Sequence, residues 1–234
     1  MAVIYGISEA TKDFLKKLPK EVKSLEDIDK IHQKLTQEFD ELENKGILST
    51  FSRWNKKRQI KKIKENADSK EHKGARGEVL ALEKLSELSD DYHIFCGVNK
   101  QLKNYITYRR ERNLRSAQMD FVVVSRRGVV VIEVKNWSSQ YYKNHYGLPP
   151  HEQVDRAGRI LWISLKSSWF SPKNPSISSV LLSVQGNIGH DDNYGYVTVK
   201  NLNNIITYLQ QKNEQFSDKE VSRLIGRVKG DVTK

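Results

Sequence analysis

The stretch QMDFVVVSRRGVVVIEVKNW, residues 118–137, constrains the fold more than any other part of the chain. Two valine-rich runs flank the polar segment SRRG, a pattern typical of two β-strands joined by a tight turn. Charged residues interrupt the apolar pattern at Asp120, Glu133 and Lys135. Because side chains alternate across a strand, Glu133 and Lys135 share one face, about 6.6 Å apart along the strand.

The position of Asp120 relative to this pair depends on the turn. If the two arginines of SRRG form a two-residue loop, Asp120 lies opposite Glu133. If the loop lies one residue later, Asp120 lies opposite Lys135 and diagonal to Glu133. Either loop places all three on one face, whereas a three-residue loop without a bulge turns Asp120 to the other face. Opposed Cβ atoms are about 5 Å apart, so two carboxylates there can reach one divalent cation.

Two interpretations of these charges are open. The first is an ordinary ion pair between Glu133 and Lys135 on a solvent-exposed face. Against it, the flanking valines indicate a strand with little exposed surface, and opposed carboxylates repel unless a charge between them compensates. Because buried charges in proteins are paired or bind metals, we favour a metal site. Beside a metal, Lys135 would stabilise an attacking hydroxide or the charge that develops on a phosphoryl group.

The charge of the chain favours a polyanionic partner. The 234 residues include 40 basic and 29 acidic side chains, a formal net charge of +11. Most of the excess lies between Arg53 and Arg76, a segment with ten basic and three acidic residues. Each phosphate neutralised there would add salt-dependent affinity, although a solvated linker helix explains the same composition equally well. The candidates for phosphate contacts in this segment are Lys56, Lys57, Arg58, Lys61 and Lys62.

Other sequence features indicate the cellular compartment and exclude several enzyme classes. A lone cysteine, Cys96, cannot form a disulfide or a thiolate zinc cluster within the chain, so we expect a reducing, cytoplasmic environment. The sequence has no signal-peptide pattern and no apolar run near the roughly 20 residues that cross a bilayer, so we expect a soluble protein with no membrane partner. It also has no Walker-type glycine loop and no nucleophile elbow.

Residues 1–72 are expected to form a helical module that is basic toward its end. From Leu25 to Leu42, apolar residues recur at intervals of three or four and a capping pattern precedes them, which predicts an amphipathic helix of about 30 Å ending near Gly46. A shorter helix before Pro19 is expected to pack antiparallel to it. The apolar stripe would dock on the main domain or on a second copy of the chain. A homo-oligomer through this helix is therefore one expectation.

The main unit, residues 73–200, is predicted to form, in order, a helix, three strands, a helix and a strand. Glu78 shares a helical stripe with apolar residues, so it is either a carboxylate placed toward a site or a first-turn acid that complements the helix dipole. Gln153 lies on the inward side of its helix start, where it would orient water or a phosphate oxygen, or cap backbone groups. Residues 201–234 are expected to form two helices that pack on this unit.

The polar segment 99–117 is expected to be a loop or hairpin beside the site. It contains three arginines that would contact nucleic acid, an ordinary solvated face being the alternative. These candidates are Arg109, Arg110 and Arg112.

The pieces GARGE, QMDFVVV, GVVVIEVKNW, HEQVDRA and VLLSVQGNIGHDDN, in this order and spacing, resemble the nuclease-related domain family, NERD, within the PD-(D/E)XK nuclease superfamily. The resemblance covers about residues 74–210 and does not extend to the N-terminal module. It implies an α/β fold with a mixed (α+β) sheet, built on a restriction-endonuclease-like αβββαβ core.

The resemblance also implies roles at matched positions. Asp120 and Glu133 would bind Mg²⁺ or Mn²⁺, and Lys135 would assist the nucleophilic water. Glu78 would be an accessory acid near the metal, and Gln153 would match the glutamine that follows the Glu-x-Lys strand in related nucleases. The turn SRRG departs from the Gly-Pro type of turn expected in this family. The two arginines of that turn, Arg126 and Arg127, are therefore added as candidates for substrate contacts.

The sequence thus predicts a metal-dependent nuclease that hydrolyses phosphodiester bonds of nucleic acid, with DNA preferred over RNA. Two alternatives stay open. One is a catalytically inactive nucleic-acid-binding or adaptor protein that keeps the nuclease fold. The other is an oligomeric scaffold built by the N-terminal helices, in which the nuclease-like domain is a passenger.

Overall fold

The computed structural model describes residues 1–44, 50–67, 69–138, 147–166 and 175–232. The chain divides into two compact units. One comprises Ala10–Arg76, and the other combines Met1–Glu9 with Gly77–Lys234. The second unit contains the β-sheet.

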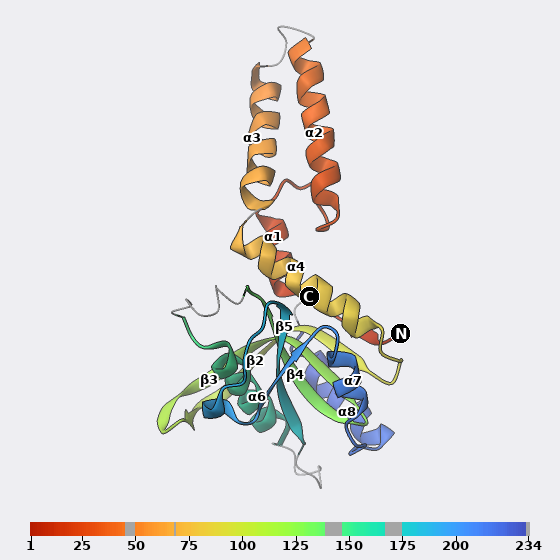
Figure 1. The fold of residues 1–234 in the computed structure, drawn as a ribbon, viewed down its shortest axis with the longest axis vertical. Helices are drawn as coiled ribbons and strands as arrows, with labels where there is room; N and C mark the ends of the chain where they lie inside the picture. The colour runs from red at the N-terminus through yellow and green to blue at the C-terminus, as the bar shows by residue number, and fades with distance from the viewer. Residues whose placement is uncertain (45–49, 68, 139–146, 167–174, 233–234) are drawn as a thin grey trace. The chain divides into compact units, whose positions relative to one another are not determined.

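The first unit is helical. It contains most of α1 (Glu9–Lys16), all of α2 (Asp27–Asn44) and α3 (Thr50–Ala67), and the start of α4 (Lys70–Ser86). Helices α2 and α3 lie side by side as an antiparallel pair (Figure 1). Their buried apolar residues form one small core with residues of α1 and the first turns of α4. That core comprises Phe14, Leu18, Val22, Ile28, Leu35, Ile63 and Ala75.

The burial of Ile28 and Leu35 in this core bears on the expected docking of the α2 stripe. These residues lie in the middle of the stripe, and they pack within their own unit. Oligomerisation through α2 therefore stays a prediction, and the stripe does not require a second copy to be covered.

The second unit is built on one six-stranded mixed sheet with the order β1-β2-β3-β4-β5-β6. Strands β2, β3 and β4 form an antiparallel meander, β5 and β6 continue from β4 in parallel, and β1 pairs in parallel with β2. The order α4, β2, β3, β4, α6, β5 confirms the predicted αβββαβ core. The strands are β1 (Val3–Tyr5), β2 (His93–Tyr108), β3 (Glu111–Ser125), β4 (Gly128–Asn136), β5 (Ile177–Gln185) and β6 (Val197–Asn201).

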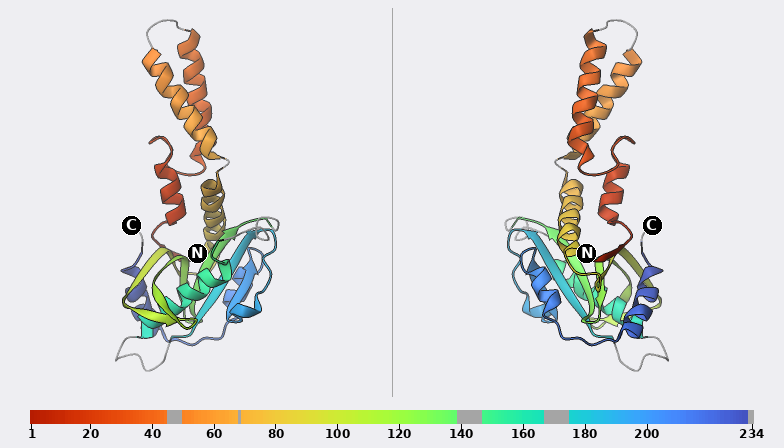
Figure 2. Two further views of the ribbon diagram at one scale, coloured as in Figure 1. Left: turned by 90° about the vertical axis from the view of Figure 1, so that its left-hand side faces the viewer. Right: turned by 90° about the vertical axis from the view of Figure 1, so that its right-hand side faces the viewer.

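Helices cover both faces of the sheet (Figure 2). On one face, α6 (Pro150–Lys166) and α8 (Asp218–Lys229) pack on one set of alternating strand residues. On the other face, the C-terminal part of α4 and helix α7 (Ile205–Gln210) pack on the complementary set. A strand that is buried on both faces needs apolar residues at successive positions, which explains the uninterrupted valine runs of β3 and β4.

Two features differ from the sequence-based expectation. Residues 1–72 are not helical throughout, because Val3–Tyr5 form edge strand β1 and Met1–Glu9 belong with the sheet. The boundary between the units falls at Gly77, inside α4. Segment 99–117, expected to be a loop or a hairpin, forms a hairpin, because β2 and β3 are long strands that continue to the turn. Residues 201–234 contain the two expected helices, and the Ser217–Glu220 capping box of α8 is present.

Within the part of the chain that the structure describes, no helix combines the length and the apolar character that a membrane crossing requires.

Candidate active site

The register of the β3–β4 hairpin decides where Asp120 lies. Ser125 pairs with Gly128 and Phe121 pairs with Ile132, so the loop consists of the two arginines between the strands. One step further along this register, Asp120 lies opposite Glu133. The Asp120 side chain accepts a hydrogen bond of 2.7 Å from the backbone N–H of Val134. The hairpin therefore has the first of the two expected registers, with Asp120, Glu133 and Lys135 on one face.

Glu133 and Lys135 form a buried ion pair. Lys135 Nζ lies 2.6 Å from Glu133 Oε1, and the two side chains are 14% and 11% exposed. Burial opposes charging of the amine, but attraction to Glu133 and Asp120 outweighs it and holds the pKa of Lys135 above its ordinary value. Lys135 is therefore a fixed cation at neutral pH and cannot serve there as a general base.

The Asp120 carboxyl group is in an environment that disfavours its charge. Burial and the neighbouring carboxylates of Glu133 and Glu78 hold the pKa of Asp120 well above its usual range, against the opposing effects of Lys135 and the Val134 N–H. Like charges held together at a stability cost are characteristic of functional sites, and a bound cation would relieve the repulsion.

Glu78 comes to the site from α4. Its side chain is buried, and one oxygen accepts a hydrogen bond from the hydroxyl of Ser8. Burial, and to a lesser degree the Glu133 carboxylate, raise the pKa of Glu78 to about 7, although the hydrogen bond from Ser8 opposes the rise. Ser8 is 70 positions away in the sequence, and no sequence pattern singled it out.

The preceding glycine makes this placement of Glu78 possible. A Cβ atom at Gly77 would lie 2.6 Å from the Cβ of Asn136, the last residue of β4. Helix α4 therefore approaches the end of β4 more closely than any residue with a side chain would allow. The motif GARGE thus contributes both a carboxylate and the close contact that brings it beside Lys135.

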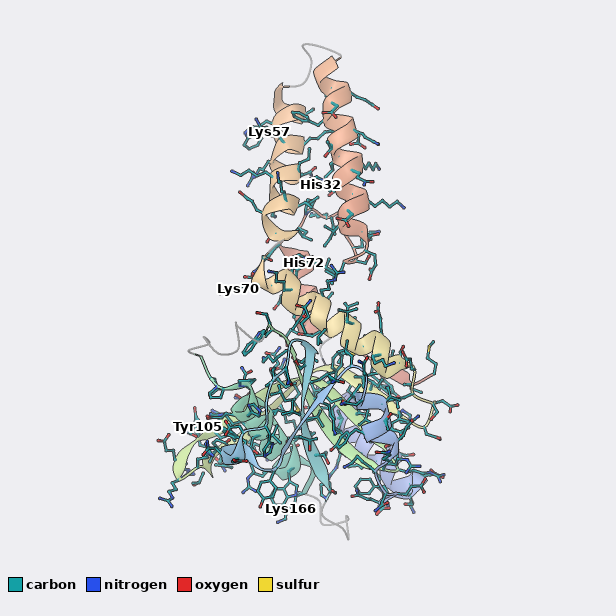
Figure 3. The ribbon with its side chains drawn as sticks, viewed as in Figure 1. His32, Lys57, Lys70, His72, Tyr105 and Lys166 are labelled. Carbon is teal, nitrogen blue, oxygen red and sulfur yellow. The ribbon has the colours of Figure 1, made fainter. Side chains whose placement is uncertain are left out.

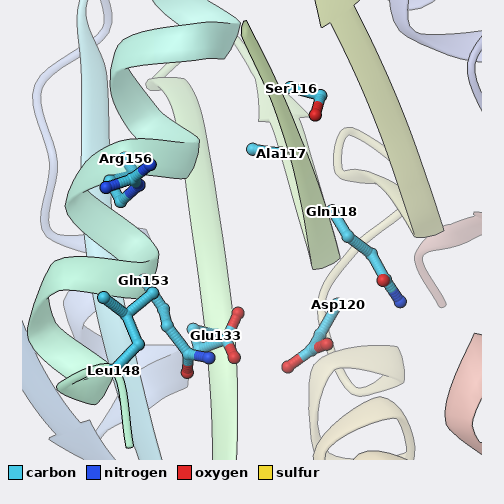
Figure 4. Close-up of a pocket in the computed structure, with 8 residues that line it drawn as sticks. All are labelled: Ser116, Ala117, Gln118, Asp120, Glu133, Leu148, Gln153 and Arg156. Carbon is cyan, nitrogen blue, oxygen red and sulfur yellow. The ribbon is translucent and has the colours of Figure 1, made fainter. Parts of the chain in front are cut away.

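Asp120 and Glu133 line a cavity of about 300 Å³. Figure 4 shows their carboxylates pointing from neighbouring strands into one space, with Gln153 entering it from α6. Gln153 Oε1 is buried, and no hydrogen-bond donor reaches it from the described part of the chain. A buried amide oxygen normally has a partner, so this atom marks a place for a ligand. Ser116, Gln118 and Arg156 also line the cavity and were not among the sequence-based candidates.

Some of the residues that line the cavity have oxygen atoms that suit a hard divalent cation. Asp120, Glu133 and Gln153 offer the oxygen ligands that Mg²⁺ and Mn²⁺ prefer, and Mg²⁺ commonly completes its shell with water and phosphate. The described residues contain no group of three or more His, Cys, Asp or Glu side chains arranged to hold a metal ion. The expected role of Glu78 as an accessory acid near the metal, beside Asp120 and Glu133, therefore stays a prediction.

The basic candidates of α3 belong to the helical unit. Four of them are exposed, and Figure 3 marks Lys57 among them. Lys56 is half-buried and forms an ion pair with Glu38 of α2, whereas the exposed Lys61 pairs with Glu65 at 3.6 Å. The guanidinium of Arg58 lies 5.5 Å from the centre of the Trp54 ring. The exposed members are Lys57, Arg58, Lys61 and Lys62.

Arg109 in the β2–β3 turn and Arg112 at the start of β3 have structural partners. Arg109 and Arg110 are the two loop residues, with φ of 47° and 72°. Arg109 donates hydrogen bonds to the hydroxyl of Tyr194 and to the carbonyl of Asn193. Arg112 donates to the carbonyl of Tyr105, whose side chain is exposed on this hairpin (Figure 3). Contact of these arginines with nucleic acid stays a prediction.

The arginines of the β3–β4 turn lie at the end of the hairpin away from Asp120. Arg126 forms a bidentate ion pair with Asp218, in which both N–O distances are 2.6 Å. Arg127 donates to the carbonyl of Lys212 at 2.5 Å. Both residues fasten the hairpin to the C-terminal segment, and the structure does not bring them to the carboxylates. Their expected substrate contacts stay a prediction without support from this geometry.

Comparison with known families identifies part of the chain. Residues 73–183 match the family described as NERD, nuclease-related domain. The matched range contains Glu78, Asp120, Glu133, Lys135 and Gln153, and it excludes Ser8. The comparisons with curated proteins and with solved structures found no match.

Proposed function

Because residues 73–183 form a nuclease-related domain of the PD-(D/E)XK-like nuclease superfamily, we propose that the protein is a metal-dependent nuclease that hydrolyses phosphodiester bonds in DNA. The observation that carries this proposal is the pair of carboxylates, half-buried Asp120 and buried Glu133, facing one cavity beside the fixed cation Lys135. An ordinary structural ion pair needs one carboxylate. The second raises the electrostatic cost and is explained by a ligand of positive charge.

Asp120 and Glu133 would hold a Mg²⁺ or Mn²⁺ ion, and Gln153 Oε1 would lie beside it. When bound, such an ion supplies Lewis-acid activation of the phosphodiester and of the attacking water. The two carboxylates themselves provide the negative charge that attracts the ion into an otherwise apolar sheet.

Lys135 would act through its charge. It stays protonated at neutral pH because Glu133 and Asp120 hold its pKa high. An ammonium group cannot accept the proton of water, so its contribution would be to donate hydrogen bonds to the attacking water or to a phosphoryl oxygen and to stabilise the negative charge that grows there. The site is already arranged before substrate binds, which lowers the reorganisation that the reaction requires.

Gln153 would position the substrate or the water. Its Oε1 is buried in the cavity without a donor from the described residues, and its amide nitrogen belongs to the same group. One end of the amide can therefore accept a hydrogen bond from water while the other end donates one to a phosphate oxygen. Gln153 sits on α6, a helix rather than a loop, which fixes it relative to the strands that carry the carboxylates.

A polyanionic substrate agrees with the charge of the chain. The net charge of +11 would speed encounter with nucleic acid and strengthen its binding at low salt. The exposed basic side chains of α3 would contribute to this attraction. DNA as the preferred substrate over RNA is part of the proposal and rests on the family alone, because the net charge attracts both polyanions equally.

The proposal is tested by cleavage of circular single-stranded DNA, supercoiled double-stranded DNA and a single-stranded RNA. Each is incubated with Mg²⁺, with Mn²⁺ or with EDTA, and Glu133→Gln and Lys135→Ala are run beside the parent protein. We expect DNA cleavage that requires metal and is lost in both variants. Binding without cleavage of any substrate, unchanged in Glu133→Gln, would instead support an inactive binding or adaptor protein.

A further inference from the structure

The cavity of the candidate site is polarised by a residue that the proposed chemistry does not use. Among the described residues that line it, Arg156 carries the single positive charge, whereas Asp120 and Glu133 carry negative charge. Arg156 follows Gln153 by three positions on α6, so the two side chains lie on one face of the helix about 4.5 Å apart along its axis. Figure 4 shows them one turn apart on the same wall.

The partners of Arg156 leave much of its hydrogen-bonding capacity unused. Its Nη1 lies 3.2 Å from Glu152 Oε1, and its guanidinium lies 5.2 Å from the centre of the Tyr108 ring. The side chain is 24% exposed. A guanidinium has five N–H donors in a planar fork, a shape that matches the oxygens of a phosphate.

A chain of contacts fixes Glu152 and thereby the guanidinium. Glu152 Oε2 accepts a hydrogen bond of 2.7 Å from the hydroxyl of Tyr194, which lies in the short 3₁₀ helix Asp192–Tyr194. The same hydroxyl accepts a bond of 3.0 Å from Arg109 at the β2–β3 turn. The guanidinium of Arg109 also lies 4.3 Å from the centre of the Tyr194 ring. The 3₁₀ helix therefore holds the carboxylate that orients Arg156, and the β2–β3 turn holds Tyr194 in turn.

We propose that Arg156 binds the substrate phosphate next to the one that is cleaved, with Glu152 and Tyr194 as positioning residues. This inference rests on the proposed nuclease function. The carboxylates at one end of the cavity would repel a phosphate that lacks a cation beside it, whereas Arg156 attracts one at the other end. A backbone bound in this way would lie along α6 with its direction set by the polarity of the cavity.

A simpler role for Arg156 is an ion pair on the helix surface, spaced four residues from Glu152. Arg159 provides the matched comparison, because it lies one turn further along α6 and outside the cavity lining. It is exposed, and its guanidinium lies 4.9 Å from the centre of the Trp162 ring. Replacing either arginine removes one positive charge from the same helix. The two variants have the same net charge, so a difference in their affinity for DNA reflects the position of the lost charge.

The experiment measures binding without cleavage. A fluorescently labelled single-stranded DNA, duplex DNA or single-stranded RNA is titrated by anisotropy in EDTA at several salt concentrations, with the parent, Arg156→Gln and Arg159→Gln. We expect Arg156→Gln to raise Kd about 10-fold and to lower the slope of log K against log salt by about 1. Arg159→Gln should match the parent in both quantities. Arg156→Lys should recover part of the affinity, since lysine still binds phosphate as a point charge.

A second variant, Tyr194→Phe, tests the same chain of contacts in case Arg156→Gln does not fold. Tyr194→Phe keeps the ring beside Arg109 and removes the hydroxyl that holds Glu152, so it should raise Kd about 3-fold and leave the salt slope unchanged, because no charge is lost. Equal affinities and equal salt slopes for Arg156→Gln and Arg159→Gln, with a parent that binds DNA, would overturn the role of Arg156 alone. A parent that binds neither DNA nor RNA would overturn the proposed nuclease and this inference together.

Discussion

The carboxylate of Asp120 accepts a 2.7 Å hydrogen bond from the backbone N–H of Val134, the residue between Glu133 and Lys135. This contact joins a side chain of β3 to the backbone of β4 in the middle of the Glu-x-Lys segment. The position of Asp120 is therefore set by strand register, which is rigid, and not by a flexible side-chain pair. The two carboxylates approach each other because the hairpin folds, before any ligand is present.

Asp120→Asn should stabilise the metal-free protein and abolish cleavage. Asparagine keeps an oxygen that can accept the Val134 N–H bond, and it removes a buried charge that Glu133 and Glu78 disfavour. We expect the melting temperature at pH 8 in EDTA to rise by a few degrees, corresponding to a gain on the order of 1 kcal/mol. Differential scanning calorimetry measures this change. A clear fall in melting temperature would contradict the electrostatic cost that we assign to Asp120.

The raised pKa of Glu78 predicts a specific pH dependence of stability. Its pKa is about 7 in the folded protein against an ordinary value of 4.5. Between these two values the unfolded chain releases the proton while the folded protein keeps it, so the free energy of unfolding falls as pH rises. Below pH 4.5 Glu78 is protonated in both the folded and the unfolded state, so it does not lower the free energy of unfolding. Above pH 7 the loss of unfolding free energy is complete, on the order of 3 kcal/mol.

Glu78→Gln tests this dependence, because glutamine does not titrate. Urea unfolding of both proteins at pH 5 and pH 8 in EDTA should show a smaller loss of stability for the variant over this interval. If parent and variant lose the same free energy between the two pH values, Glu78 does not have the raised pKa described above.

Lys135→Met should lower both stability and activity, for separable reasons. The buried Glu133 carboxylate would lose its cation, and breaking a buried pair by removing one partner costs about 3 to 5 kcal/mol. The double variant Glu133→Gln with Lys135→Met removes both charges and should regain most of that stability. Cleavage should stay at least about 100-fold below the parent in both variants. Chemical unfolding and an initial-rate assay measure the two effects, and cleavage restored in the double variant would refute a catalytic role for this pair.

The two glycines of GARGE should respond oppositely to alanine. Nothing lies within 4 Å of a Cβ placed at Gly74, so Gly74→Ala should stabilise the helix by up to about 1 kcal/mol. At Gly77 the added Cβ would be 2.6 Å from the Cβ of Asn136, so Gly77→Ala should cost about 1 to 3 kcal/mol and displace the end of β4. Thermal and urea unfolding of the two variants provide the comparison. Equal effects would mean that α4 does not approach β4 as closely as the structure has it.

The central hairpin could be predicted from sequence because its information is local. Alternation along a strand places Glu133 and Lys135 on one face, and a short turn limits Asp120 to a few registers. The capping box at Ser217 and Glu220 is similarly a local signal, and the structure contains it. The order of helices and strands follows from the same short-range patterns.

What the sequence did not reveal depends on long-range contacts. Strand β1 has three residues, too few for a periodic pattern, and it pairs with residues about 90 positions later. The Ser8–Glu78 hydrogen bond joins the same two regions. Arg156 looks like any helix-surface arginine until the cavity beside it is known. Arg126 and Arg127 looked like substrate contacts because their partners, Asp218 and the carbonyl of Lys212, are distant in sequence.

Whether Asp120 and Glu133 form a metal site is decided by Mn²⁺ binding without nucleic acid, followed by isothermal titration calorimetry and electron paramagnetic resonance. We expect a Mn²⁺ site in the parent that is lost in both Asp120→Asn and Glu133→Gln, with both variants still folded. We also expect proton release on binding to increase as pH falls, because the cation favours the charged form of Asp120, whose pKa is raised in the metal-free protein. A parent that binds no Mn²⁺ up to millimolar concentration, or variants that bind it as the parent does, would contradict the assignment of this carboxylate pair as a metal site.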